Sequence, residues 1–101
     1  MSRYTNDAQQ RVLKIAVLLA GHEVHGLAPA VIARDVMCTP SVVTRDMANM
    51  EEAGWAERVP ATGAWRLAPA PVQIALRHMA ALDQAESRLS EIKQRDSRAS
   101  T

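Results

Sequence analysis

The sequence predicts a mostly α-helical protein with one small β-hairpin, followed by a long C-terminal helix. Three observations lead to this prediction. Apolar residues recur every three or four positions in three stretches before Gly54, and a short alternating pattern around a Pro-Ala-Thr-Gly turn follows. A helical pattern then resumes after residue 69 for about six turns. The 101 residues suffice for one domain with a modest core, so a long element outside that core would gain from a partner.

Composition excludes several classes of protein. Lys and Arg total 12 against 11 for Asp and Glu, so overall charge alone does not indicate a nucleic-acid partner, and any such affinity must come from local clustering. The single cysteine, Cys38, excludes an internal disulfide and is typical of a reducing cytoplasm. No apolar run reaches the ~18 residues of a membrane span and no signal sequence is visible. We therefore expect a soluble, cytoplasmic protein without a membrane partner.

The first predicted helix runs to Gly21 from Asn6 or Asp7, either of which can cap it. Its inward residues recur at helical spacing and are Val12, Ile15, Ala16 and Leu19. Residues 1–5 carry no such pattern and are predicted to be a flexible arm. For this arm a frayed terminus is favoured over contacts of Arg3 and Tyr4 with a partner.

A turn-rich connector follows, in which Glu23 lies between His22 and His25. Two histidines three apart can bind a metal from one helix face, but glycines border this segment and no second ligand cluster is visible. We interpret these histidines as exposed loop residues and predict no metal site and no cofactor. The second predicted helix spans residues 27–37, and its inward residues are Leu27, Ile32, Ala33 and Val36.

The third predicted helix, between Thr39 and Gly54, has its own start and stop signals. Thr39 is a candidate N-cap, Pro40 suits the first helical position because its missing N–H costs nothing there, and Gly54 ends the helix. The inward face carries Val43, Met47 and Met50, and the outward face carries Ser41, Val42, Arg45 and Asn49. Such a helix is held by one face and is free to contact a partner with the other.

The residues after Gly54 change to a period of two. Alternation over 55–59 and again over 64–67, with Pro60-Ala-Thr-Gly63 between them, predicts a short β-hairpin. Gly63 at its tip permits the positive φ that a tight turn requires. We interpret Trp55 and Trp65 as packing residues of the core or the hairpin.

The Ala-Pro-Ala-Pro joint at 68–71 ends the hairpin and starts the long helix, predicted over 69–95. Its second half has charged flanks that are typical of a self-pairing coiled coil, so we expect a homodimer. An isolated amphipathic helix is the alternative, and parallel and antiparallel pairing both remain open. The predicted dimerisation residues are Leu76, Met79, Leu82, Leu89 and Ile92. Residues 96–101 are small and polar and are predicted to be a disordered tail.

The third helix also carries a longer pattern: a small polar residue, Val, any residue and Arg, then two long apolar residues three apart, Glu, Gly and an aromatic. The residues that form it are Ser41, Val43, Arg45, Met47, Met50, Glu51, Gly54 and Trp55. This pattern resembles the DNA-binding domain of winged helix-turn-helix transcription regulators, most closely the IclR family. Methionines stand where the family usually has leucines, a change of similar volume, and Asp46 stands where an apolar residue is common.

The resemblance implies a winged helix-turn-helix domain over 6–68, with a recognition helix at 40–53 and a wing at 56–67. In such a domain the helix meets base edges in the major groove while basic groups hold phosphates. Arg45 suits a guanine or a phosphate, Val42 a thymine methyl, and Asn49 an adenine or a backbone oxygen. The predicted DNA-binding residues are Thr39, Ser41, Val42, Thr44, Arg45, Asn49, Arg58 and Arg66. A solvated helix face is the alternative interpretation.

We therefore predict a dimeric, sequence-specific regulator of transcription, acting as a repressor, that binds double-stranded DNA at a pseudo-palindromic operator. IclR-type regulators carry an effector domain after the DNA-binding part, and none is visible here, so we expect no small-molecule effector. A DNA-binding domain without an effector domain is, by analogy, typical of small phage or mobile-element regulators. No Gly-rich phosphate loop, supported nucleophile or paired buried acids indicate an enzyme.

Two other functions remain open. The first is a protein–protein interaction module, which the near-neutral charge favours together with four acids near the reading face: Asp46, Glu51, Glu52 and Glu57. The second is a nucleoid-associated protein that coats DNA with little sequence preference, because shape and phosphate contacts alone suffice for that.

Overall fold

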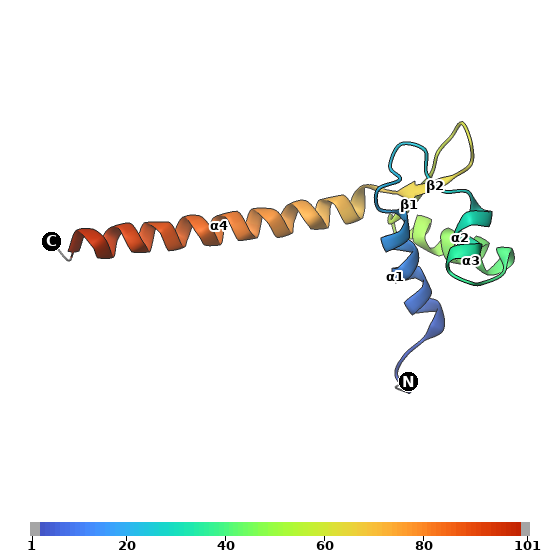
Figure 1. The fold of residues 1–101 in the computed structure, drawn as a ribbon, viewed down its shortest axis with the longest axis horizontal. Helices are drawn as coiled ribbons and strands as arrows, with labels where there is room; N and C mark the ends of the chain where they lie inside the picture. Colours follow the sequence, from blue (N-terminus) through green and yellow to red (C-terminus); the bar gives the residue numbers. More distant parts are fainter. Residues whose placement is uncertain (1–2, 100–101) are drawn as a thin grey trace. The chain divides into compact units, whose positions relative to one another are not determined.

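A computed structural model describes residues 3–99 of the chain, and its described part is mostly helical, with one two-stranded antiparallel hairpin and a long C-terminal helix (Figure 1). The coarse fold predicted from the sequence is therefore confirmed. The chain divides into two units that meet between Pro71 and Val72. We call the first unit the head. Its elements are α1 (Asp7–Leu19), α2 (Pro29–Asp35), α3 (Pro40–Glu52), β1 (Ala56–Arg58) and β2 (Trp65–Leu67). The last helix, α4 (Pro69–Ala99), starts in the head and makes up the second unit.

Helix α1 begins as the sequence predicted. The Asn6 side chain accepts a hydrogen bond from the Gln9 backbone N–H at 3.0 Å, so Asn6 is the N-cap. Asp7 then lies in the first turn, where its negative charge favours the helix dipole. Of the predicted arm at 1–5, Met1 and Ser2 lie outside the described residues. In the rest of the arm, the guanidinium of Arg3 donates to the hydroxyl of Tyr4 at 2.8 Å.

Helices α2 and α3 end in the same way. The residue after each C-cap has positive φ, +58° at Met37 and +80° at Gly54, and the N–H groups that follow return to carbonyls of the last turn. Glycine adopts this conformation freely, whereas Met37 takes it against the steric cost of its Cβ. The turn at Met37 leads directly to the Thr39 cap of α3, so α2 and α3 are joined by a short, hydrogen-bonded connection.

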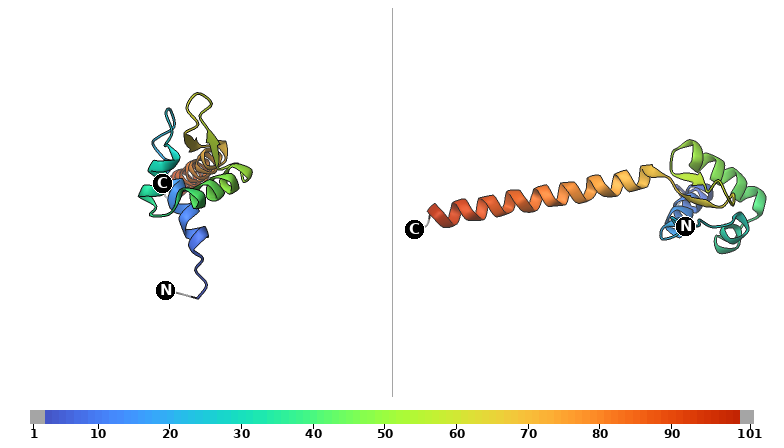
Figure 2. Two further views of the ribbon diagram at one scale, coloured as in Figure 1. Left: turned by 90° about the vertical axis from the view of Figure 1, so that its right-hand side faces the viewer. Right: turned by 90° about the horizontal axis from the view of Figure 1, so that it is seen from above.

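Helix α2 is shorter than the predicted 27–37, because its first residues have another role. Leu27 forms an isolated antiparallel bridge with Trp65, with N–H to O=C distances of 2.8 Å in both directions. The connector after α1 therefore lies beside β2 (Figure 2). Within this connector Gly21 N–H donates to Glu23 Oε1 at 2.8 Å, and this hydrogen bond lowers the pKa of the Glu23 carboxyl.

The hairpin pairs Ala56 with Leu67, Glu57 with Arg66 and Arg58 with Trp65. Its turn uses Gly63 at a φ of +74°, as predicted. Ala56 and Trp65 face the core, whereas Arg58 is exposed. Trp65 is 3 % exposed and Trp55 is half-buried against the same core, so both tryptophans are packing residues, as the sequence predicted.

The core of the head is one apolar cluster drawn from all three of its helices and both strands. Each residue predicted to face inward from α1, α2 and α3 belongs to this cluster or packs against it. The fully buried residues are Ile15, Leu19, Ile32, Val43 and Met47. No residue of α4 belongs to the core cluster among those the structure describes.

Helix α4 is 31 residues long and ends at Ala99, beyond the predicted end at residue 95. The prediction of a disordered tail at 96–101 is thus wrong for 96–99, and residues 100 and 101 lie outside the described part. Small polar residues indicated a tail, but the helix continues to Ala99, and Arg98 Nε donates to Gln94 O, four residues earlier, at 3.4 Å. Over residues 3–99, no helix has both the length and the apolar character needed to cross a membrane.

Close packing at Gly26 provides a test of the contact between the connector and β2. A Cβ at Gly26 would lie 2.6 Å from the Trp65 carbonyl oxygen, whereas one at Gly21 would meet nothing within 4 Å. Both glycines have positive φ, so alanine strains the backbone at either site. We expect Gly26→Ala to lower the free energy of unfolding by about 2 kcal/mol more than Gly21→Ala, measured by urea denaturation. Equal losses at the two sites would contradict the close packing.

Candidate nucleic-acid interface

The structure brings most of the predicted reading residues to one exposed face of α3. Ser41, Thr44, Arg45 and Asn49 are exposed, together with the Thr39 cap, and Val42 is half-buried. The opposite face, with Val43, Met47 and Met50, is buried in the core. The helix therefore has the division into a held face and a free face that its sequence predicted.

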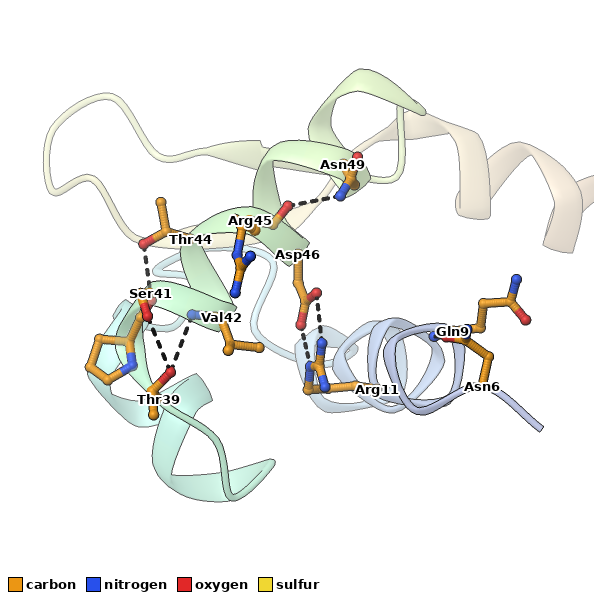
Figure 3. A network of polar contacts seen from close by, with 11 residues as sticks. Asn6, Gln9, Arg11, Thr39, Ser41, Val42, Thr44, Arg45, Asp46 and Asn49 are labelled. Carbon is orange, nitrogen blue, oxygen red and sulfur yellow. Dashed lines mark hydrogen bonds and ion pairs between the residues drawn. The ribbon is translucent and has the colours of Figure 1, made fainter. Parts of the chain in front are cut away.

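The polar groups on this face are partly used inside the helix. Thr39 Oγ1 accepts from Val42 N–H at 3.4 Å and lies 3.2 Å from Ser41 Oγ, and Thr44 Oγ1 donates to Pro40 O at 3.0 Å. Asn49 Nδ2 donates to Arg45 O at 3.1 Å (Figure 3). The Ser41 and Thr44 hydroxyls each keep an acceptor lone pair, and the Asn49 amide keeps its oxygen and a second N–H. The helix thus orients these groups without exhausting them.

Arg45 differs from these neighbours. It is exposed, and its guanidinium has no hydrogen-bond or ion-pair partner among the described residues. It is the one arginine or lysine of α3. A planar guanidinium with five free N–H donors matches the two acceptors of a guanine edge or the oxygens of a phosphate. Arg45 is therefore the group on this face with the largest unused capacity for an anionic or hydrogen-bonding partner.

The two hairpin arginines predicted to contact phosphates have partners within the chain. Arg66 Nε lies 3.1 Å from Glu57 Oε1, its cross-strand neighbour, and is half-buried. The Arg58 guanidinium lies 4.4 Å from the centroid of the Trp65 ring, and its Nη1 donates to Gly63 O at 3.5 Å. Stacking keeps the charge and several donors of Arg58 available to solvent, whereas Arg66 must leave Glu57 to bind a phosphate. Of the two, Arg58 is the better placed for an external anion.

The sequence analysis counted Asp46 among the acids near the reading face, but in the structure its side chain is buried. It is 5 % exposed and faces α1, where it forms a bidentate ion pair with Arg11 (Figure 3). Arg11 Nη2 donates to Asp46 Oδ1 at 3.1 Å, and Arg11 Nε donates to Oδ2. The hydrogen bond to Asp46 raises the pKa of the Arg11 guanidinium, which favours its charged form. Because the Asp46 carboxylate is buried beside its counter-ion, it adds no unpaired negative charge to the exposed face of α3.

The sequence analysis missed the role of Arg11. In the helical pattern of α1 it is one more polar position, and the partner lies 35 residues away in the chain. The acid at an otherwise inward position of α3 was the available signal, since buried carboxylates need a counter-charge.

The remaining predicted acids have different environments. Glu57 is paired with Arg66, while Glu51 and Glu52 are exposed in the last turn of α3, far along the helix from Ser41. His22 and His25 are exposed in the connector. Within residues 3–99 no group of three or more His, Cys, Asp or Glu side chains is arranged to hold a metal ion.

Removal of one partner tests the ion pair between α1 and α3. Arg11→Met leaves the Asp46 carboxylate buried without a donor. We expect this substitution to lower the free energy of unfolding by about 3 kcal/mol relative to the wild type. The double variant Arg11→Met/Asp46→Leu removes both charges and should recover most of that loss, measured by urea denaturation. If the double variant is no more stable than Arg11→Met, the carboxylate is not the buried charge that the structure shows.

Comparison with known proteins gives no assignment for this arrangement. No protein-family profile matches the sequence, and neither the curated proteins nor the solved structures gave a significant match. The inference of function therefore depends on the site itself: an exposed polar helix face with an unpaired arginine, beside a hairpin with a second exposed arginine.

Proposed function

We propose that the chain is a sequence-specific DNA-binding regulator of transcription, built as a winged helix-turn-helix and acting as a dimer that represses by occupying an operator. One observation carries this proposal: α3 is buried along one face and presents Ser41, Thr44, Arg45 and Asn49 along the other, with the Arg45 guanidinium unpaired within residues 3–99. A helix presented in this way fits the major groove of B-DNA.

The surroundings of α3 support the proposal. The tight connection between α2 and α3 agrees with a helix-turn-helix, and the hairpin that follows corresponds to the wing, with Arg58 exposed on it. Burial of Asp46 and pairing of Glu57 remove two of the four acids that favoured a protein-docking module. These pairings leave the N-terminal part of α3 without an unpaired acid, which suits contact with phosphates.

A change at Arg45 tests base reading. Fragments that the wild type selects from random DNA would be titrated by fluorescence anisotropy at two salt concentrations. Arg45→Ala should weaken binding to selected fragments about 10-fold to 100-fold, the range for loss of one bidentate base contact, and should lose most of the selection. Arg77→Ala, which removes one exposed arginine from α4, is the matched control and should keep the selection.

The same titration separates the alternatives. Binding by the wild type that falls with salt but does not select fragments would favour a DNA-coating protein, because phosphate contacts release counter-ions whatever the sequence. Absence of binding even at low salt would refute the proposal and favour a protein-docking module.

Substitutions on the two faces of α4 test whether this helix forms the dimer interface. Leu89 is 53 % exposed in the single chain, and Leu89→Asp should shift the protein to monomer in sedimentation equilibrium while the helical signal of the head persists. Ser87→Asp, on the opposite face of the same turn, is the matched control and should stay dimeric. A dimer that tolerates Leu89→Asp would show that this part of α4 is not the interface.

A further inference from the structure

The head carries an apolar groove that borders the proposed DNA-binding face at Asn49, which lines one edge of it. The groove has a volume of about 220 Å³ and lies between α1, the end of α3 and the residue that follows it. Its apolar lining residues are Val12, Leu13, Ala16, Met50, Ala53 and Trp55. Leu13 is 59 % exposed, and Val17, one turn further along α1, is 76 % exposed. An apolar surface of this kind on a small domain indicates a docking site.

Helix α4 carries two apolar stripes that face different directions. The first stripe is Val72, Leu76 and Met79, and the second stripe is Ile74, Leu82, Leu89 and Ile92. With about 100° between successive residues, the mean directions of the two stripes differ by roughly a third of a turn. All seven side chains are exposed in the single chain. One partner helix covers a single seam, so it cannot bury both stripes.

The second stripe alone is too short for a stable dimer. It spans residues 74–92, fewer than three heptads, whereas coiled coils are typically sustained over about three to four heptads. Stable protein interfaces bury about 800 Å² on each partner, mostly through a well-packed apolar centre. A dimer held through α4 therefore needs further apolar area, and the groove and the first stripe are the two uncovered surfaces that supply it.

We propose that the first stripe of one copy of α4 lies in the head groove of a second copy. The inference rests on the dimer in the proposed function and adds a second interface to it. Val72 to Met79 spans about 10 Å of helix and Val12 to Val17 about 8 Å of α1, so the two surfaces match in length. In a two-fold dimer the contact forms twice, which doubles the apolar area buried beside the second stripe. Each head is then positioned by the partner's helix.

Chemical cross-linking between single-cysteine chains tests this contact. In a Cys38→Ala background, one chain carries Leu13→Cys and the other Leu76→Cys, and the two are mixed, equilibrated and treated with a short bis-maleimide. Each chain has one thiol, so a 13–76 link joins two copies. We expect covalent heterodimer from this mixture and at least about 10-fold less from Leu13→Cys with Arg77→Cys, whose direction is about 130° around α4 from the centre of the first stripe.

A variant in the groove gives an independent measurement. Leu13→Glu places a charge in the apolar contact and should raise the dimer dissociation constant at least about 10-fold, measured by sedimentation equilibrium. Val24→Glu replaces an apolar side chain that is 74 % exposed in the connector, outside the groove, and should leave the constant unchanged. Circular dichroism of both variants verifies that the head is folded.

The outcomes separate this inference from the proposed function. If the wild type is dimeric and reads DNA but the 13–76 link does not form between chains, the groove contact is wrong and the proposed function stands. A link that forms within one chain carrying both Leu13→Cys and Leu76→Cys, and not between single-cysteine chains, would assign the groove to the chain's own helix. A monomeric wild type would overturn both the dimer and the groove contact.

Discussion

The arrangement of the head depends on the ion pair between Arg11 and Asp46. Asp46 lies on the buried side of α3, between Val43 and Met47 in the helical repeat, and its carboxylate is satisfied by a guanidinium from α1. A rotation of α3 by one residue, about 100°, would expose Asp46 and leave Arg11 without its partner. Apolar packing alone tolerates small rotations, whereas a bidentate ion pair has a defined geometry. The ion pair thus adds a directional contact, about 100° around the helix from Arg45, to the apolar contacts that hold α3 in the core.

Pairing of charges inside the chain leaves a positive group on the exposed face of α3 although the protein is nearly neutral overall. The total of 12 basic against 11 acidic side chains suggests no preference for an anionic partner. In the structure, however, Asp46, Glu57 and Asp35 are each paired with an arginine, while the guanidinium of Arg45 is unpaired among the described residues. Local potential, and not net charge, decides where an anion binds, because screening limits the reach of exposed charges to about 10 Å.

Among the described residues, α4 contributes nothing to the core cluster, so the head and α4 have separate structural roles. The head closes its core with three helices, a hairpin and the Leu27 bridge to Trp65. This leaves the apolar residues of α4 for contacts outside the chain's own core, which is consistent with both the proposed dimer and the proposed groove contact. The groove at α1 and Trp55 is the counterpart on the head: an apolar surface that the head's own residues do not cover.

The sequence by itself determined the elements whose signals are local. The Asn6 and Thr39 caps, the Gly54 stop, the inward face of α3 and the Gly63 turn all depend on residues within a few positions of one another, and each was predicted correctly. Only the tertiary structure decided the contacts between distant residues: the pairing of Arg11 with Asp46, the bridge of Leu27 to Trp65 and the groove between α1 and α3. Helical periodicity marks which face is apolar but not which distant side chain meets it, so the sequence showed an acid at a usually apolar position of α3 but not the arginine that pairs with it.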